Sequence, residues 1–291
     1  MSRIDNIEIF QDTVKLCKSK DVLKNAIKKA TREQKLILET DEIPIPNREK
    51  YKNPAKVLVS KKRSFEAASE YKEQRICVHN FASATNPGGG VVKGSSAQEE
   101  CLCRCSTLYM SLNTPSMWEG FYTPHRNIQN PIHNDDCIYT PEVVVLKTDT
   151  ATPELLPEAE WYKVNVITCA APNLREKPAN AMNAGDGFKK VTITDDTLQA
   201  IHEKRLERIL DIALNEGNEV VILGAFGCGA FENKPEVVAK AAKKVIQKYQ
   251  YAFKTIEFAV YCSPKDETNY KTFYSVIKDS YKKKSKTNYS L

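Results

Sequence analysis

Strand-like and helix-like segments alternate along most of this chain, and this alternation restricts the folds that it can adopt. Short runs rich in Val, Ile and Leu read as strands, and segments with the apolar spacing of helices separate most of them. The predicted strands are residues 56–60, 75–82, 143–147, 164–169, 219–227 and 255–262. The predicted helices are residues 64–71, Ser95 or Ser96 to about Leu112, 195–215, 235–249 and 269–281. Such alternation predicts an α/β sandwich with a largely parallel or mixed sheet.

Both ends of the chain depart from this pattern and suggest how it is divided. Residues 5–40 contain neither Pro nor Gly and predict one or two amphipathic helices. Residues 41–54 carry three prolines and read as a connector. We therefore expect a helical extension with its connector over residues 1–54, one α/β domain over 55–282 and a basic tail over 283–291.

The charge balance excludes one class of partner. The 291 residues contain 43 Lys and Arg against 37 Asp and Glu, which gives a net charge of +6. Part of this positive excess lies near the C-terminus, at Lys282, Lys283, Lys284 and Lys286. We expect this tail to be solvated. The rest of the chain is nearly balanced, which argues against sequence-specific binding of nucleic acid through a strongly basic face.

Composition also predicts the compartment. No apolar run approaches the roughly 18–20 residues that a membrane-spanning helix needs. Charged residues occupy the start of the chain, where a signal peptide requires apolar ones. Nine cysteines are an odd number in a chain too long to need disulfide staples, which favours a reducing compartment. We expect a cytoplasmic or otherwise intracellular monomer that does not bind membranes.

No metal site is expected. Cys101, Cys103 and Cys105 are spaced i, i+2, i+4, which spreads them over several faces of a helix. Structural zinc sites instead use closely spaced CxxC pairs, and the remaining His and Cys residues supply no second matching pair. These cysteines are expected to pack in the interior.

The most informative segment is residues 79–105, HNFASATNPGGGVVKGSSAQEECLCRC, in which a predicted strand runs into a glycine-rich loop. Glycine has no side chain and adopts positive φ. Gly88, Gly89 and Gly90 therefore allow the backbone to approach a ligand and to direct N–H groups at phosphate or ribose oxygens. A Walker A loop is excluded, because Ser95 occupies the position where that motif requires lysine.

Two adjacent acids follow these glycines. A capping box is matched twice, by Ser95-x-x-Gln98 and by Ser96-x-x-Glu99, and either match puts Glu99 and Glu100 in the first helical turn. Neighbouring helical residues point about 100° apart, so the two carboxylates cannot flank one glycosidic bond as in an ordinary glycosidase. We expect one carboxyl to act as acid and base while the other orients a substrate hydroxyl.

The pKa of such an acid is subject to opposing effects. The helix N-terminus lowers it, whereas burial and the second carboxylate raise it. A proton donor at neutral pH requires the raising effects to dominate.

A second glycine-rich loop, LGAFGCGAFENKP, follows a predicted buried strand at residues 223–235. It lacks the G-x-G-x-x-G fingerprint of a dinucleotide-binding site and reads instead as a diphosphate-cradling turn. Phe231 is available to cover a sugar or a base, while Phe226 is expected to pack in the core. Ligands bind at the carboxyl ends of strands in such sheets, so we expect the two loops to form one site.

Triglycine, a seven-residue spacer and Gln98-Glu99-Glu100 together resemble the signature of the poly(ADP-ribose) glycohydrolases. The later GAFGCGAF resembles the diphosphate loop of the same family, and Asn86-Pro87 with the N-terminal helices is similar to its microbial, bacterial-type branch. The resemblance extends from about Asn6 to Tyr281. It implies a macrodomain-like catalytic domain, a three-layer α/β/α sandwich with a mixed sheet, in agreement with the alternation described above.

The resemblance also implies roles for individual residues. Glu100 matches the catalytic acid, Glu99 its substrate-orienting neighbour and Asn86 the residue that contacts the distal ribose. The other implied substrate contacts lie in the loop over the ribose, in the diphosphate-binding turn and in the aromatic ring beside the ribose: Gly88, Gly89, Gly90, Val91, Gln98, Gly227, Cys228, Gly229, Ala230 and Phe231. No residue is assigned to stack on the adenine.

By resemblance, the reaction cleaves the ribose–ribose O-glycosidic bond at the chain end of poly(ADP-ribose) and releases ADP-ribose. Glu100 would act as general acid and then as base through an oxocarbenium-like transition state, without a metal or an organic cofactor. Two alternatives remain open, a hydrolase of mono-ADP-ribose on proteins or nucleic acids and a non-catalytic macrodomain that only binds ADP-ribose. The acid pair discriminates against the latter, because a binding module has no use for adjacent buried acids.

Overall fold

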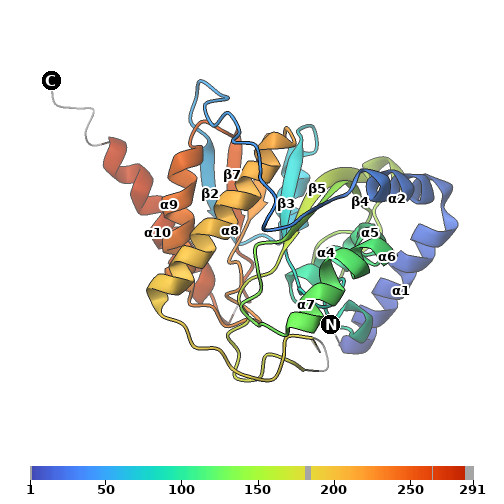
Figure 1. Ribbon diagram of the computed structural model, residues 1–291. Coiled ribbons are helices and arrows are strands. Elements are labelled where there is room, and N and C mark those ends of the chain that lie inside the picture. The colour runs from blue at the N-terminus through green and yellow to red at the C-terminus, as the bar shows by residue number, and fades with distance from the viewer. Residues whose placement is uncertain (1, 181–184, 264, 286–291) are drawn as a thin grey trace.

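A mixed sheet of seven strands forms the centre of the computed structural model, which describes residues 2–180, 185–263 and 265–285 (Figure 1). The strands are β1 (Lys35–Ile37), β2 (Lys56–Ser60), β3 (Ile76–Phe81), β4 (Cys137–Val145), β5 (Tyr162–Cys169), β6 (Val220–Leu223) and β7 (Thr255–Ala259). They lie in the order β1-β4-β5-β3-β6-β7-β2. From β5 to β2 all neighbours are parallel, whereas β4 is antiparallel to both of its neighbours.

Helices cover both faces of the sheet and make the fold three-layered (Figure 1). One face carries α8 (Asp195–Asn215), α9 (Pro235–Ile246) and α10 (Thr268–Ser285). The other carries α1 (Arg3–Ser19), α3 (Ser64–Ala68), α4 (Gln98–Cys105) and α5 (Leu108–Leu112). Further helical segments are α2 (Asp21–Glu33), α6 (Pro115–Met117), η3 (Trp118–Tyr122), α7 (Thr123–Ile128) and the short turns η1 (Ser69–Tyr71), η2 (Val91–Lys93), η4 (Glu158–Glu160) and η5 (Gln247–Tyr249). The predicted α/β/α sandwich with N-terminal helices is confirmed.

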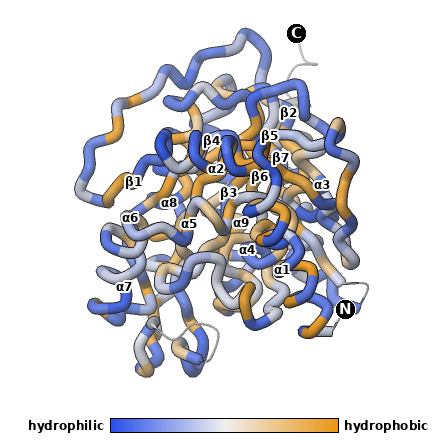
Figure 2. Tube along the Cα trace, turned by 90° about the vertical axis from the view of Figure 1, so that its right-hand side faces the viewer, coloured by the Kyte–Doolittle hydropathy of each residue, from blue (hydrophilic) through white to orange (hydrophobic). Residues whose placement is uncertain are grey.

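Side chains alternate between the two faces of a sheet. In the central strands, the side chains on both faces are apolar. In β6, Val221 and Leu223 pack on the face covered by α8 and α9, whereas Val220 and Ile222 pack on the opposite face, where α3 lies. Strands buried on both faces read as continuous apolar runs, which is why the sequence pattern identified them. Figure 2 shows this apolar centre with hydrophilic segments around it.

The N-terminal extension contributes a strand that the sequence pattern did not predict. Residues Lys35–Ile37 pair antiparallel with β4, with Leu36 opposite Ile138, and form the edge of the sheet. Three residues directly after a helix are too few to show the alternation of a strand. Residues 41–54 contain neither helix nor strand, as expected of a connector.

The start of α1 packs on the loop that leads into α4. Gly94 has a φ of +75°, and a Cβ atom at this position would lie 2.3 Å from the backbone oxygen of Arg3. The Nδ2 group of buried Asn6 donates a hydrogen bond to the Gly94 oxygen at 3.0 Å. Further along α1, the Thr13 hydroxyl donates to the Arg104 oxygen at 2.6 Å. The extension therefore holds both this loop and the helix that follows it.

The prediction of one helix from Ser95 or Ser96 to Leu112 is wrong. Helix α4 begins only at Gln98, and residues 106–107 separate it from α5. The Thr107 N–H donates to the Val144 oxygen at 3.0 Å, and Ser106 forms an isolated bridge with Val145. The backbone thus pairs with β4 at this point instead of continuing the helical bonds.

The prediction of a strand over residues 143–147 is also wrong in its limits. The strand β4 begins at Cys137 and shifts its register between Thr140 and Val143. Proline lacks the N–H that a sheet requires and is tolerated at bulges, so Pro141 concealed the first half of the strand.

Other predicted ends need smaller corrections. Strand β6 ends at Leu223 rather than at residue 227, and β7 ends at Ala259 rather than at 262. Helix α10 continues to Ser285, beyond the expected domain end at 282. Most of the expected basic tail, residues 286–291, lies outside the described part of the chain.

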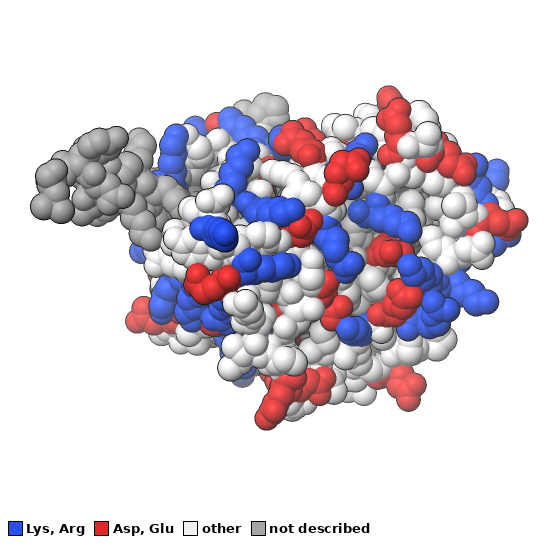
Figure 3. Space-filling model, turned by 90° about the horizontal axis from the view of Figure 1, so that it is seen from above, with Lys and Arg blue, Asp and Glu red and all other residues white. Residues whose placement is uncertain are grey.

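Seen from above, basic and acidic side chains are interspersed on the surface (Figure 3). Ion pairs link α9 and the turn after it to α8, with Lys244–Glu203 at 2.6 Å and Lys248–Glu207 at 2.8 Å. The face drawn in Figure 3 carries no extended field of one sign. Among the described residues, none of the helices is both long enough and apolar enough to cross a membrane.

Replacing Gly94 by alanine should destabilise the protein. The new Cβ would meet the Arg3 backbone, and a φ of +75° strains any residue with a side chain. We expect the free energy of unfolding in urea to fall by about 1–3 kcal/mol. Gly229→Ala is the matched control, since a Cβ there meets nothing within 4 Å. Equal unfolding curves for the two variants would show that α1 does not brace this loop.

Candidate active site

A cavity of about 630 Å³ lies at the carboxyl ends of the parallel strands. The loop after β3 lines it with Gly89 and Gly90, and the loop after β6 lines it with Gly227, Gly229 and Phe231. Strands β3 and β6 are parallel neighbours, so their carboxyl ends meet at the same edge of the sheet. The structure thus brings the two glycine-rich loops together in one site, as the sequence predicted.

The first loop lies directly on the two carboxyl groups. Gly89 has a φ of +57°, and a Cβ atom there would lie 2.7 Å from Oε1 of Glu100 and 3.1 Å from Oε2 of Glu99. Only glycine lets the backbone approach the acids so closely. The next N–H, that of Gly90, donates to Oε1 of Glu100 at 2.8 Å.

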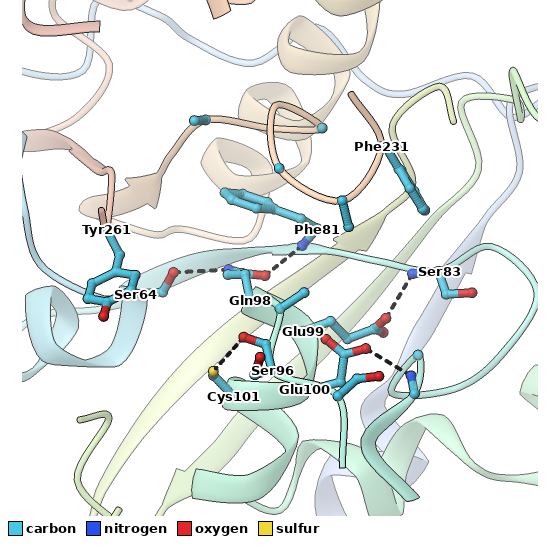
Figure 4. A pocket seen from close by; sticks show the side chains of 18 of the residues that line it. Ser64, Phe81, Ser83, Ser96, Gln98, Glu99, Glu100, Cys101, Phe231 and Tyr261 are labelled. Atoms are coloured by element: carbon cyan, nitrogen blue, oxygen red, sulfur yellow. Dashed lines mark hydrogen bonds between the residues drawn. The ribbon is translucent and has the colours of Figure 1, made fainter. Parts of the chain in front are cut away.

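The two acids occupy the first turn of α4 and are both buried, with 3% of Glu99 and 7% of Glu100 exposed. Oε2 of Glu99 accepts a hydrogen bond from the Ser83 N–H at 2.8 Å, and Oε1 accepts one from Nδ2 of Asn80 at 3.2 Å. Glu100 differs, because its Oε2 atom has no hydrogen-bond partner within the described residues. Figure 4 shows the two carboxyl groups side by side, with Glu99 turned to Ser83.

Burial raises the pKa of both carboxyls. For Glu99 burial is the largest cause and the charge of Glu100 adds to it, which raises its pKa to about 8. Burial likewise raises the pKa of Glu100, against the lowering effect of the Gly90 N–H. The raising effects therefore dominate over the helix N-terminus, and a proton remains on the pair at neutral pH.

The predicted capping boxes are wrong. The N-cap of α4 is Ala97, which has no side chain to cap with, and Ser96 lies outside the helix. The amide of Gln98 instead accepts from the Phe81 N–H at 2.9 Å and donates to the Ser64 hydroxyl at 2.9 Å (Figure 4). It also donates to the His79 oxygen at 2.8 Å. Gln98 lines the cavity, but its amide is used to tie α4 to β3.

Asn86 lies beside the cavity and is not among the residues that line it. Arg126 donates hydrogen bonds to Oδ1 of Asn86 and, at 2.6 Å, to the Thr85 oxygen, while its guanidinium lies 4.6 Å from the Trp118 ring centre. The Thr85 hydroxyl donates to buried Asp186 at 3.2 Å. The segment before the glycines is therefore fixed from several directions.

Gly88 and Val91 also lie behind the cavity wall. A Cβ atom at Gly88 would meet the Tyr109 ring at 2.8 Å and Sγ of Cys103 at 3.2 Å. Val91 is fully buried in the core beneath α1. Of the three glycines, Gly89 and Gly90 face the cavity.

The second loop is held by a residue that sequence reasoning missed. Nδ2 of Asn233 donates to the oxygens of Pro172, Gly227 and Phe231 at 2.6, 3.2 and 3.1 Å. His202, in α8, is hydrogen-bonded to Oδ1 of Asn233 at 2.8 Å. These contacts fix a turn in which Gly227 has a φ of +78°.

Three residues of this turn line the cavity, Gly227, Gly229 and Ala230. Gly229 and Ala230 are exposed and line the cavity together with Phe231, whereas Cys228 is half-buried against the core and is not part of the lining. Phe226 is buried against His79, with ring centres 4.4 Å apart, so its predicted packing role is confirmed.

The end of the cavity opposite Phe231 is formed by residues that the sequence analysis did not identify (Figure 4). The Arg63 guanidinium lies 3.9 Å from the centre of the Tyr261 ring, and its Nη1 donates to Sγ of Cys101 at 3.3 Å. Asp149 lies in the same wall, and burial raises its pKa to about 6. Arg63 and Tyr261 follow the carboxyl ends of β2 and β7, so strand position was the signal that could have found them.

The cysteines and histidines do not gather into a metal site. In the described part of the chain, no group of three or more His, Cys, Asp or Glu side chains could hold a metal ion. Cys101, Cys103 and Cys105 are buried, and all nine cysteines are free thiols.

Comparison with protein families and solved structures identifies relatives. Residues 5–148 match the family described as the catalytic domain of microbial-type poly(ADP-ribose) glycohydrolase (PARG). No curated protein sequence gives a significant match.

Among solved structures, PARG from Thermomonospora curvata has a TM-score of 0.79 and 25% identity, covering 93% of this chain and 98% of that one. PARG from Deinococcus radiodurans in complex with ADP-ribose has a TM-score of 0.71 and 27% identity, covering 87% of this chain and 97% of that one. Family, fold and the two-loop site agree with the resemblance found in the sequence. The chain therefore belongs to the microbial-type poly(ADP-ribose) glycohydrolases.

Proposed function

We propose that the cavity binds the terminal ADP-ribose unit of poly(ADP-ribose), and that the enzyme cleaves the ribose–ribose O-glycosidic bond to release this unit as ADP-ribose. The observation that carries the proposal is the pair of buried carboxyls beneath Gly89, in which Oε2 of Glu100 has no partner among the described residues. Substrate would be the polymer or ADP-ribosylated proteins, and the product is ADP-ribose.

The volume and the lining residues of the cavity support this proposal and indicate how the ligand is oriented. Its volume of about 630 Å³ is within the range of small-molecule sites. The turn from Gly227 to Ala230 offers backbone N–H groups to the diphosphate, as anion-binding turns do. Phe231 then covers the terminal ribose, whose anomeric carbon faces Glu100. In this orientation the adenine extends toward Arg63 and Tyr261, where an aromatic ring is available for stacking.

The difference between the two acids assigns their roles in the proposal. Both oxygens of Glu99 accept protein hydrogen bonds, so this carboxyl is fixed and serves to orient a ribose hydroxyl. Glu100 has one oxygen fixed by Gly90 and one oxygen open to substrate. Glu100 is therefore the group that transfers the proton.

The proposed reaction proceeds in two steps on one carboxyl. Glu100 donates its proton to the oxygen of the leaving ribose as the glycosidic bond breaks and positive charge develops on the terminal ribose. The polymer leaves with this proton on its hydroxyl. The Glu100 carboxylate then takes a proton from water, whose oxygen bonds to the anomeric carbon. The diphosphate and the neighbouring acid stabilise the transient positive charge.

The buried acid pair argues against a protein that only binds ADP-ribose. Two carboxyls in contact beneath a loop disfavour ionisation and reduce stability, and a binding module gains nothing from them. Residues 55–282 then form the catalytic domain, and the extension over residues 1–54 braces the loop that leads into the helix of the two acids.

Glu100→Gln tests the assignment of the acid. Glutamine keeps the size and the bond from Gly90 but donates no proton, so kcat on poly(ADP-ribose) should fall at least about 100-fold. Affinity for ADP-ribose should change by only a few-fold. Chromatography of released ADP-ribose measures the rate, and calorimetry measures the affinity.

Glu8→Gln, at an exposed position of α1, is the matched control and should keep full activity. Full activity of Glu100→Gln would contradict the assignment. An inactive wild type that binds ADP-ribose tightly would contradict the polymer reaction, and a singly modified protein would then be the substrate to test.

The pH dependence of kcat tests the raised pKa. Because the acid must carry its proton and burial raises the pKa of Glu100, the rate should hold to higher pH than an ordinary glutamate would allow and fall as the pH rises through this raised pKa. Glu99→Gln removes the second carboxylate, so the alkaline fall should move to lower pH. Single-turnover rates between pH 5 and pH 10 measure both curves, and an unmoved alkaline fall would contradict coupling of the two acids.

Tyr261→Ala tests the orientation of the ligand. Loss of a ring that stacks on a base costs about 1–3 kcal/mol, so ADP-ribose should bind roughly 5- to 150-fold more weakly. Tyr261→Phe should bind like the wild type. Calorimetry on the Glu100→Gln background separates affinity from turnover, and an unchanged affinity of Tyr261→Ala would contradict adenine binding at this end.

A further inference from the structure

The wall of the cavity beside the catalytic loop is built partly by the N-terminal extension. Arg3 and Asn6, both in α1, line the cavity together with Gly94, Ser95 and Ser96. Asn6 is hydrogen-bonded to the Gly94 oxygen at 3.0 Å, and Gly94 packs against the Arg3 backbone. The start of α1 is thus fixed next to the segment that enters α4.

This wall lies on the side of Glu100. The Ser95 N–H donates to the Gly90 oxygen at 3.2 Å, and the Gly90 N–H in turn donates to Oε1 of Glu100 at 2.8 Å. Arg3, which packs against Gly94, therefore belongs to the part of the cavity wall next to Glu100.

Three arginines line the cavity, and their surroundings differ. Arg63 lies over the Tyr261 ring, and Arg175 donates to Asn173 at 3.1 Å and to the Pro178 oxygen. Arg3 is exposed, and within the described chain its side chain makes neither an ion pair nor a hydrogen bond. It is thus a cation at the cavity wall that is available to a ligand.

Asn6 gives an independent indication of a ligand at the same place. It is 4% exposed, and its Nδ2 group is used on Gly94, but its Oδ1 atom has no hydrogen-bond partner within the described residues. Buried acceptors in folded proteins are normally paired with a donor. A hydroxyl of a bound sugar is a donor of the required kind.

The chemistry of the substrate supplies a group that fits Arg3. In the polymer, the bond to be cleaved joins the terminal ribose to the preceding ADP-ribose unit, which carries two negatively charged phosphates. When the terminal unit fills the cavity with its ribose at Glu100, the preceding unit must leave the cavity past Glu100. It then passes the wall formed by Arg3, where a guanidinium pairs well with a diphosphate.

We propose that Arg3 and Asn6 at the start of α1 form a second subsite, which binds the diphosphate and a ribose hydroxyl of the unit that precedes the cleaved bond. The inference rests on the proposed position of the terminal unit with its ribose at Glu100. It implies that the extension favours a polymer over free ADP-ribose as ligand, since the product has no preceding unit.

Arg3→Gln tests this subsite on size-fractionated poly(ADP-ribose) and on free ADP-ribose. KM for the polymer should rise roughly three- to tenfold with little change in kcat, while the affinity for free ADP-ribose should stay at the wild-type value. The increase of KM with NaCl should also be less steep in the variant, because one phosphate contact is lost. Arg3→Lys keeps the charge and should restore most of the affinity.

Lys18→Gln is the matched control, since it removes the same charge from the same helix about 22 Å further along and should leave KM unchanged. An unchanged polymer KM in Arg3→Gln would overturn the subsite, and so would an equal loss of affinity for polymer and free ADP-ribose. If the wild type released no ADP-ribose from the polymer, the proposed function would fail instead, which distinguishes the two results.

Discussion

The close contact between the backbone at Gly89 and the carboxyl groups of Glu99 and Glu100 is the arrangement on which the rest of the site depends. Two neighbouring acids are buried there, and burial favours their neutral forms. The N–H groups of Ser83 and Gly90 offset part of this cost, one on each carboxyl. The result is a pair that retains a proton at neutral pH while one oxygen of Glu100 stays open to a substrate. Any larger residue at Gly89 would push the loop away and expose the pair to water.

The loop keeps this position because it is supported from behind. Arg104, almost fully buried, donates to the Ser95 oxygen and to Sγ of Cys101, and its own backbone oxygen is held by Thr13 of α1. Asn6 holds Gly94 in the same way. The N-terminal helix thus contributes to the rigidity of the loop that leads into α4. Rigid positioning of this kind is what general acid catalysis requires.

Much of this arrangement could be predicted from the sequence, since the strands buried on both faces read as apolar runs and the two glycine-rich loops follow two of them. Predictions failed where tertiary contacts replaced local ones. The capping boxes at Ser95 and Ser96 did not form, because Ala97 ends the loop and the Gln98 amide is used on β3. Pro141 concealed half of β4, because the bulge that accommodates it has no local signature.

The residues at the far end of the cavity were missed for a different reason. Arg63, Asp149 and Tyr261 come from three distant segments and share no motif, so only the order of the strands brings them together. Asn6 similarly reads as an ordinary position of an amphipathic helix, and Arg3 lies before the predicted start of that helix. Motifs predict the part of a site that one loop carries, whereas the sheet topology decides what completes it.

The most direct test of the proposed ligand position and of the role of Glu100 is a crystal structure of the Glu100→Gln protein with ADP-ribose. We expect the terminal ribose between Phe231 and position 100, with its anomeric hydroxyl within hydrogen-bond distance of the substituted side chain and the adenine against Tyr261. ADP-ribose bound in the reverse orientation, with its adenine at position 100, or bound outside this cavity, would contradict this expectation.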